Sequence, residues 1–398
     1  MNRRHFLQTV LASTGLLTGC PQLFAAPATD SRFLLVFLRC GYDAANIVIP
    51  FTSPFYYEAR PSLAIAKPEP NNQQAALPLN TDWGLHPALK DSVLPMFQQK
   101  QLIFIPFAGT EDVSRSHFET QDSIELGQPL GGHRDLNSGF LNRLVSVLTG
   151  SHAIAFTDNL PLICKGHADI PNFSLTKNGQ RFLQDRQMAI ISEMYQGRGN
   201  WSHYVQEGLS LQAEVGQDMA AEEMAQASRG AIPAKGFELQ ARRMAKLMRE
   251  KFNIGFVDIG GWDTHLNEGA ADGQLANKIA NLGNGLAVFA KEMGTMWAKT
   301  VVLVISEFGR TFRENGNRGT DHGHGTVYWV LGGSIKGQQI LGEQTTVTQK
   351  NLFEDRDYPV LNNYRDLIGG LFQAQFGLSA TQVQTLFAGA NPTKLPWL

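Results

Sequence analysis

The sequence has little cysteine, no excess of charge of one sign and no apolar run long enough to cross a bilayer. Its 398 residues include three cysteines, too few for a disulfide-built scaffold. Cys40 and Cys164 lie beside apolar runs, as buried thiols do. A disulfide between them is the alternative. Lys and Arg number 34 against 36 Asp and Glu, so the net charge of −2 gives no reason to expect nucleic-acid binding. The 43% hydrophobic content is typical of a globular chain that buries a sizeable core.

The first residues have the form of an export signal. Arg3-Arg4-His5-Phe6-Leu7 resembles a twin-arginine motif, and the apolar stretch that follows, residues 9–17, is too short for a transmembrane helix. We therefore predict a signal peptide over residues 1–26 and a periplasmic mature protein. Residues 17–20 resemble a lipoprotein-processing box, so a lipid on Cys20 is the one predicted link to a membrane. Cleavage beside Ala25, with Cys20 a chance cysteine, is the alternative.

Apolar runs alternate with helical patterns along the rest of the chain, which predicts an α/β fold with a mostly parallel sheet. The predicted central strands are Arg32–Leu38, Leu102–Phe107, Ile254–Ile259, Thr300–Ile305 and Val327–Leu331. Shorter strands are predicted at 153–156 and 160–163, and helices at 84–99, 117–126, 140–148, 275–297, 364–376 and 380–387. Residues 178–250 are mostly helical in pattern, so we predict a helical insertion within a single domain spanning residues 32–398.

The stretch from Val301 to Gly333 is the richest in titratable groups. Two apolar strands enclose a glycine-rich loop that contains Glu307, Arg310, Asp321, His322 and His324. Carboxylate plus imidazole is the ligand mixture for Zn, Mn or Fe, and less typically for Ca or Mg. The four acidic and histidine residues of this loop are therefore predicted metal ligands. Two interpretations of Arg310 stay open: a planar fork that holds an anionic group, or a structural ion pair.

Two further segments place acidic or histidine side chains just after a predicted strand. Asp43 follows the first strand, and Asp263 and His265 follow Ile254–Ile259 across a Gly-Gly pair. Because parallel strands share one carboxyl edge, these residues and the loop above should converge on one or two divalent ions. We expect Zn, Mn or Ca there. The alternative for Asp263 is a helix cap, with His265 a solvated loop residue.

Ser116 stands at the start of the predicted helix 117–126, just beyond the strand Leu102–Phe107. A serine in this place either caps the helix or acts as a nucleophile or anion anchor beside free backbone amides. The neighbouring Arg115 and His117 favour a catalytic role, so both interpretations stay open.

Seven motifs together carry a resemblance to a known family. They are LRCGYDAANIVIPF at 38–51, Tyr57 with Arg60-Pro61, GLHPAL at 84–89, RSHFETQD at 115–122, GGWDTH at 260–265, SEFGRT at 306–311 and GTDHGHG at 319–325. With the twin-arginine signal, they resemble the exported bacterial proteins of domain-of-unknown-function 1501, a sulfatase-like group in the alkaline phosphatase superfamily. The resemblance covers nearly the whole mature chain. It implies an alkaline phosphatase-like, three-layer α/β/α sandwich.

The resemblance also implies roles for particular residues. By position, Asp43 resembles the first-strand ligand and Ser116 lies in the nucleophile region. Asp263 with His265 resembles the third ligand segment. Glu307 stands at the fourth segment, and His322 or His324 resembles the last histidine. Three departures weaken the match. No Cys/Ser-x-Pro-x-Arg sequence occurs, so a formylglycine mechanism lacks support. Phe308 also stands where the family pattern has a histidine, and the Asp–His spacing of two in GGWDTH is shorter than the phosphatase spacing of four, which puts a second metal in doubt.

The sequence thus favours an exported, metal-dependent hydrolase of phosphate or sulfate esters. Its predicted catalytic residues are Ser116, His117 and Arg310, and its predicted metal ligands are Asp43, Asp263, His265, Glu307, Asp321, His322 and His324. The alternative is a non-catalytic, sulfatase-like protein that binds a partner protein or an exported glycan. An exported redox protein is a third, weaker hypothesis, because cysteines are few and no nucleotide-binding fingerprint occurs.

Overall fold

The computed structural model describes residues 30–131, 134–175, 194–197, 199–206, 208 and 236–398. The predicted signal peptide and most of the predicted helical insertion lie outside these residues. The C-terminal part of that insertion is helical, as helix α8 (Phe237–Glu250). Within the described residues, no helix is both long enough and apolar enough to cross a membrane.

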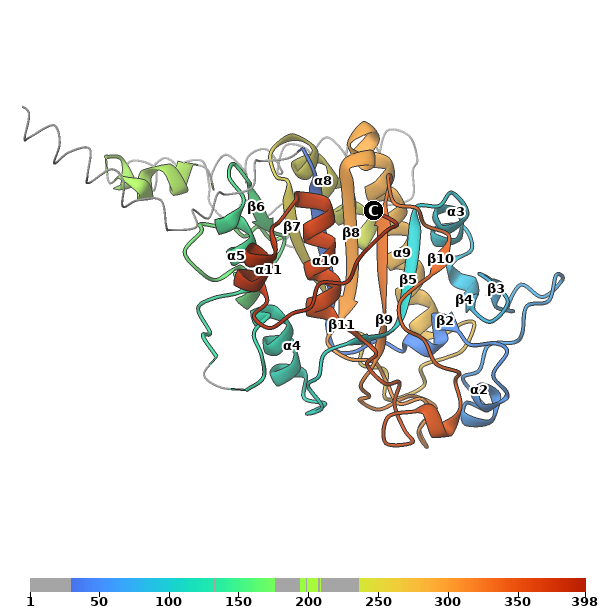
Figure 1. The fold of residues 1–398 in the computed structure, drawn as a ribbon. Coiled ribbons are helices and arrows are strands. Elements are labelled where there is room, and N and C mark those ends of the chain that lie inside the picture. The colour runs from blue at the N-terminus through green and yellow to red at the C-terminus, as the bar shows by residue number, and fades with distance from the viewer. Residues whose placement is uncertain (1–29, 132–133, 176–193, 198, 207, 209–235) are drawn as a thin grey trace, which may run out of the picture.

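An eight-stranded sheet forms the centre of the molecule (Figure 1). In spatial order its strands are β10 (Gln339–Ile340), β5 (Leu102–Gly109), β9 (Thr326–Gly332), β8 (Thr300–Ser306), β1 (Arg32–Leu38), β7 (Ile254–Ile259) and β6 (Ala153–Ala155), and β11 (Asn362–Asn363) also pairs with β5. Of these strands, β9 is the one that runs antiparallel to its neighbours. The predicted mostly parallel sheet is therefore confirmed.

Side chains of β1 alternate between two apolar cores, one on each face of the sheet. Phe33, Leu35 and Phe37 pack in the first core, while the even-numbered Leu34 and Val36 pack in the second. The first core is covered by α5 (Phe140–Val147), α10 (Tyr364–Phe376) and α11 (Ala380–Leu386), and the second by α3 (Val93–Gln98), α8 and α9 (Gln274–Met293). The period of two along a strand separates these faces, which confirms the three-layer α/β/α sandwich.

Two local predictions were wrong. Leu160–Ile163 is no strand, because Pro161 leads into a 3-10 helix, η4 (Leu162–Cys164). The predicted helix over 84–99 is divided into β4 (Gly84–Leu85), η3 (Pro87–Leu89) and α3. Pro95 lacks an N–H group, so it sits in the first turn of α3 and could not lie inside one long helix. Cys40 and Cys164 are free thiols, so they form no disulfide with each other.

A small antiparallel sheet and α2 (Pro54–Ala59) lie beside the main sheet. The small sheet contains β2 (Val48–Ile49), β4 and β3 (Leu77–Pro78). The loops that carry the predicted site residues follow β1, β5, β7 and β8 at their carboxyl ends. Since β9 is antiparallel, the loop that precedes it, including GTDHGHG, lies at this same edge. Segments far apart in the sequence therefore meet at one edge of the sheet.

Candidate metal centre

The GGWDTH turn after β7 is fixed by its tryptophan and threonine. The Trp262 side chain is buried, and its Nε1 donates a hydrogen bond to the carbonyl of Ile259 at 2.9 Å. The hydroxyl of Thr264 donates to Glu268 Oε2 at 2.7 Å. With these two side chains anchored inside, Asp263 and His265 stay together, and His265 Nε2 lies 2.9 Å from Asp263 Oδ1.

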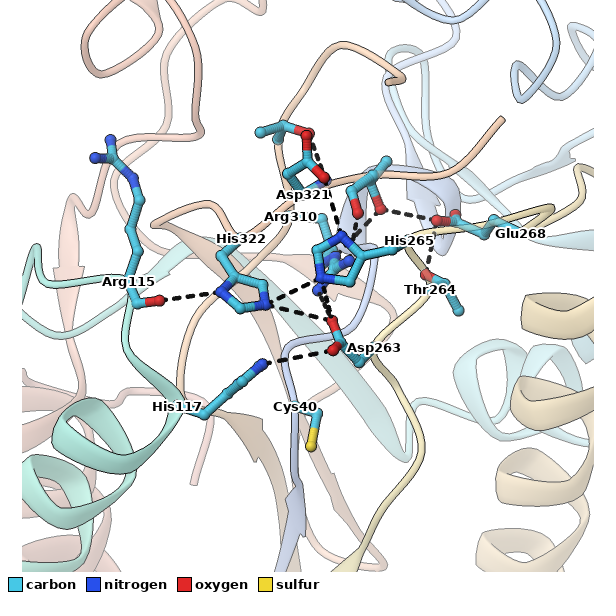
Figure 2. A network of polar contacts seen from close by, with 12 residues as sticks. Cys40, Arg115, His117, Asp263, Thr264, His265, Glu268, Arg310, Asp321 and His322 are labelled. Atoms are coloured by element: carbon cyan, nitrogen blue, oxygen red, sulfur yellow. Dashed lines mark hydrogen bonds and ion pairs between the residues drawn. The ribbon is translucent and has the colours of Figure 1, made fainter. Parts of the chain in front are cut away.

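Four side chains from three distant segments meet at this turn (Figure 2). We refer to His117, Asp263, His265 and His322 as the His–Asp cluster. His322 Nε2 lies 3.2 Å from His265 Nε2 and 3.4 Å from Asp263 Oδ1, while His117 Nε2 lies 3.8 Å from Asp263 Oδ2. Ligand atoms of His117, Asp263 and His322 all lie within 4.8 Å of one another. The structure therefore brings together three of the predicted metal ligands and His117, which we had predicted to be catalytic.

Each imidazole of the cluster is held through its Nδ1 atom. His117 Nδ1 contacts Glu307 Oε1 at 3.0 Å, and His265 Nδ1 contacts Asp321 Oδ1 at 2.9 Å. His322 Nδ1 contacts the backbone carbonyl of Arg115 at 3.1 Å. Carbonyl and carboxylate oxygens only accept, so each Nδ1 donates, and a ring without a second proton turns its Nε2 lone pair toward the cluster. This arrangement of acceptor, imidazole and free Nε2 is the one found around metal-bound histidines.

The Nε2 atoms need a cation or a proton between them. Two lone pairs 3.2 Å apart on His265 and His322 would repel each other, and His265 Nε2 also lies 2.9 Å from Asp263 Oδ1, so a proton or a cation is required here. Nε2 of His117 is buried and has no hydrogen-bond partner. Donors bound tetrahedrally at the usual Zn–N distance lie about 3.3–3.4 Å apart. The donor types and their spacing therefore fit a divalent transition-metal ion.

Arg310 lies behind Asp263 in a buried ion pair. Its Nη1 contacts Asp263 Oδ1 at 2.5 Å, its Nε donates to Thr320 Oγ1 at 3.2 Å, and its side chain is 0% exposed. Burial raises the pKa of Asp263, but the hydrogen bond and charge of Arg310 outweigh it and hold that pKa below the usual value. Of the two interpretations of Arg310, the structure shows the ion pair, because no face of its guanidinium is open to an anionic ligand.

Glu307 supports His117 from behind and does not face the centre of the cluster. Its buried Oε1 accepts hydrogen bonds from the backbone N–H of Cys40 at 2.7 Å, from Gln121 Nε2 at 2.8 Å and from His117. Burial alone raises the pKa of Glu307, yet these hydrogen bonds lower it overall, so the carboxylate stays ionised. Phe308, which replaces the expected histidine, stacks on the ring of His117 with the two ring centroids 4.9 Å apart.

Asp321 has the same relation to His265. It accepts hydrogen bonds from His265 Nδ1 and, at 3.1 Å, from Asn315 Nδ2. Although partial burial raises the pKa of Asp321, these contacts lower it overall. Both Glu307 and Asp321 were predicted as direct ligands. The structure corrects this placement, because each carboxylate holds a histidine that faces the cluster.

Asp43 and His324 lie outside the cluster, contrary to prediction. Asp43 is buried against Arg60, whose Nη1 and Nη2 both donate to its carboxylate, the latter at 2.9 Å. Burial would raise the pKa of Asp43, but Arg60 lowers it overall, whereas burial and the charge of Asp43 raise the pKa of Glu268 well above its usual value. His324 packs on Phe353 at 4.9 Å, and burial lowers its pKa to about 4. Each is committed to the interior of the protein.

Ser116 caps α4 (His117–Leu126), since its Oγ accepts from the backbone N–H of Glu119 at 3.5 Å. Within the described residues, its hydroxyl makes no hydrogen bond to the cluster. The neighbouring Arg115 has a left-handed backbone with φ of +54°, and its Nε donates to buried Asp357 at 2.9 Å. This conformation presents the Arg115 carbonyl to His322. No sequence pattern predicts that role, because any residue type supplies a carbonyl.

The chain was compared with families and with proteins of known sequence or structure. The family model described as "Protein of unknown function (DUF1501)" matches residues 30–387. No curated protein matches the chain.

The solved structures that resemble this chain include the following three. A protein of the alkaline phosphatase superfamily from Vibrio parahaemolyticus has 12% identity and a TM-score of 0.41, over 94% of this chain and 76% of that one. The lipoteichoic acid synthase LtaP from Listeria monocytogenes has 9% identity and a TM-score of 0.36, over 94% and 78%. The phosphonate monoester hydrolase of Agrobacterium radiobacter has 9% identity and a TM-score of 0.32, over 91% and 78%. We base the function on the geometry of the His–Asp cluster and not on these distant likenesses.

Proposed function

The chain belongs to the DUF1501 family of proteins of unknown function, and on this premise we propose that it is a metal-dependent hydrolase of phosphate or sulfate esters. The observation that carries the proposal is the convergence of three Nε2 atoms and the Asp263 carboxylate, with each imidazole fixed through Nδ1. As the sequence suggests, the protein would be exported by the twin-arginine route and be periplasmic or lipid-anchored through Cys20.

The ligands proposed for the ion are His117, His265 and His322 through Nε2, and Asp263 through a carboxylate oxygen. Imidazole nitrogens outnumber oxygens in this set, which favours Zn²⁺ or Mn²⁺. Ca²⁺, which we had also expected from the sequence, binds oxygen ligands and suits this set poorly.

A divalent ion at this place would supply a Lewis acid for an ester oxygen and lower the pKa of a water molecule. The protein residues around it have separate tasks. Arg310 already balances the charge of Asp263, so the positive charge of the ion would remain to attract an anionic group. The side chains of His265 and Asp263 are 38% and 37% exposed, so a substrate can reach the cluster. Glu307 and Asp321 keep His117 and His265 in the tautomer that binds.

A second function, a non-catalytic protein that binds a glycan or a partner protein, is favoured by one specific observation. Two of the predicted catalytic groups do not reach the cluster: the guanidinium of Arg310 is fully buried, and Ser116 caps a helix. Under this alternative the ion would be structural. Bound metal without turnover of any phosphate or sulfate ester would favour it.

The experiment compares two histidines of the same motif. We expect wild-type protein, expressed through its own export route, to contain about one metal ion per chain by elemental analysis and to hydrolyse an aryl phosphate or an aryl sulfate. His322→Ala should lose both properties. His324→Gln is the matched control: its side chain lies two residues away but packs on Phe353, so metal content and turnover should persist.

Three results would count against the proposal. Wild-type protein without stoichiometric metal would exclude a metal-dependent enzyme. Metal retained by His322→Ala would show that the cluster is not the site. Equal loss in His322→Ala and His324→Gln, with unchanged unfolding midpoints, would place the metal elsewhere in the motif.

A further inference from the structure

A second cavity, of about 400 Å³, lies along the same edge of the sheet as the His–Asp cluster. Its walls include Arg39, which follows β1, Asp258 near the end of β7, and Phe156, which follows β6. Asn159 and Gln240 complete the polar lining. A cavity of this size is in the range that holds small organic ligands. No residue of the cluster lines it, so it is a separate site.

The charges around this cavity disfavour an anion. Two aspartates, Asp158 and Asp258, line it together with one guanidinium, that of Arg39. The guanidinium is already neutralised, since its Nε contacts Asp258 Oδ2 at 2.7 Å and its Nη1 contacts Glu125 Oε1 at 2.8 Å. A phosphate or sulfate group would therefore meet a guanidinium with no spare positive charge beside the carboxylate of Asp258. The ligand that fits this wall is uncharged.

The remaining polar groups can bond to hydroxyls. Within the described part of the chain, the side-chain amides of Asn159 and Gln240 make no hydrogen bond, and Oδ1 of Asp258 is likewise unpaired. An amide both donates and accepts, as a sugar hydroxyl does, and a carboxylate oxygen accepts. Phe156 and Val257 are 4% and 3% exposed and give the cavity an apolar floor. Hydroxyl-bonding walls over an apolar floor match the hydroxyls and C–H faces of a sugar ring.

A short chain of hydrogen bonds joins this cavity to the cluster. Arg39 Nη1 donates to Gln121 Oε1 at 2.8 Å, and Gln121 Nε2 donates to Glu307 Oε1 at 2.8 Å. The same oxygen of Glu307 holds His117. Two side chains thus separate the wall of the cavity from a proposed metal ligand, and one extended molecule could occupy both sites.

We propose that this cavity binds an uncharged sugar unit of the molecule whose ester group reaches the His–Asp cluster. The statement about the ester rests on the proposed function, whereas sugar binding does not. The two can be tested apart, because an uncharged sugar has no group for the cluster to hydrolyse.

The test measures binding of three neutral probes, maltotriose, cellotriose and galactotriose, by isothermal titration calorimetry. We expect at least one probe to bind wild-type protein, and the double variant Asn159→Ala/Gln240→Ala to bind it about tenfold more weakly or worse, since two hydrogen-bonding side chains are lost. The side-chain amides of both residues have no hydrogen bond within the described residues, so the variant should fold, which its unfolding midpoint checks. Gln344→Ala, which lines a different cavity of about 500 Å³, is the matched control and should bind like wild type.

The same titration on protein stripped of metal by a chelator separates the two proposals. Binding that survives chelation, in a protein that hydrolyses no ester, would leave the sugar site standing and refute the hydrolase. No binding of any of the three probes would overturn the sugar site whether or not esters are hydrolysed. Binding that the double variant retains, or that Gln344→Ala loses equally, would also overturn it.

Discussion

Glu307→Gln removes one negative charge from behind His117 and preserves the surrounding geometry. Glu307 Oε1 accepts hydrogen bonds from three N–H groups of other residues, whereas Oε2 lies 3.0 Å from the hydroxyl of Ser306. That hydroxyl donates to the carbonyl of Leu38 at 2.6 Å, so it is able to accept from a new amide. A glutamine with its oxygen at the Oε1 position therefore keeps all three acceptor contacts and directs its NH₂ at Ser306.

The expected effects differ strongly between metal binding and folding. The acceptor for His117 Nδ1 remains but loses its negative charge, which makes the ring a weaker ligand. Mutating the partner behind a metal-bound histidine typically weakens metal binding about 10–100-fold, or about 1.4–2.8 kcal/mol. The metal-free protein loses the charge assistance of three hydrogen bonds but no longer buries a charge, and these terms oppose each other. We expect its free energy of unfolding to change by less than about 2 kcal/mol. Glu307→Gln should therefore bind metal poorly while remaining folded.

The pH dependence gives a second signature. Despite burial, hydrogen bonds hold the pKa of Glu307 below its ordinary value of 4.5 in the folded protein. The carboxylate therefore contributes stability above the unfolded pKa, and this contribution is lost as the pH falls through the folded pKa. Glutamine has no such titration. The unfolding free energy of wild type minus that of Glu307→Gln should accordingly fall on acidification below about pH 4.5.

Competition with a chelator measures the metal affinity, and urea unfolding of metal-free protein measures stability. Glu125→Gln is the matched control, because this buried carboxylate contacts Arg39 and the N–H of Ile163 but not His117. It should change stability and leave metal affinity unchanged. Equal metal affinity in wild type and Glu307→Gln would refute the reasoning, and so would an equal loss in Glu125→Gln.

Three further substitutions separate the roles of neighbouring groups. Glycine in Arg115→Gly adopts the left-handed backbone without strain, but the variant loses the contact with Asp357. The carbonyl at position 115, which holds His322, should then be less well fixed, and metal affinity in a chelator competition should fall about tenfold. Unchanged affinity would exclude this positioning role. Asp43→Asn leaves Arg60 unpaired in the interior and should cost about 3–5 kcal/mol in urea unfolding. The metal content per folded chain of Asp43→Asn should equal that of wild type, and a loss of metal would show that Asp43 is a ligand after all. Ser116→Ala should cost about 1 kcal/mol as a lost helix cap while metal-loaded turnover persists, whereas lost turnover at full metal content would identify a nucleophile.

The fold could be predicted because burial leaves a local trace in the sequence. The apolar runs that became β1, β5, β7, β8 and β9 need both faces covered, and such runs occur in few other settings. Their shared edge followed from parallel pairing. The helical prediction over residues 84–99 was wrong because Pro95 has no backbone N–H to donate, so it fits only the first turn of a helix.

The sequence predicted which segments meet at this edge of the sheet, but not which side chains face the cluster and which stand behind them. Metal ligands and the acceptors behind them are chosen from the same residue types, so Asp321 and Glu307 could not be told from Asp263. Only the folded geometry shows which oxygen faces a ring nitrogen. Asp43 was predicted to be a ligand because the sequence does not show its ion pair with Arg60, which forms only when the chain folds.

The tautomers of the three histidines have a consequence for when metal can be captured. His117 and His265 are synthesised before the residues that hold their Nδ1 atoms, Glu307 and Asp321. The third, His322, is itself late, although its acceptor at Arg115 is early. Until nearly the whole C-terminal half has left the ribosome, none of the three rings is held for binding. Metal capture should therefore come only after most of the chain has been synthesised, so that a bound ion would mark molecules in which the three segments have met.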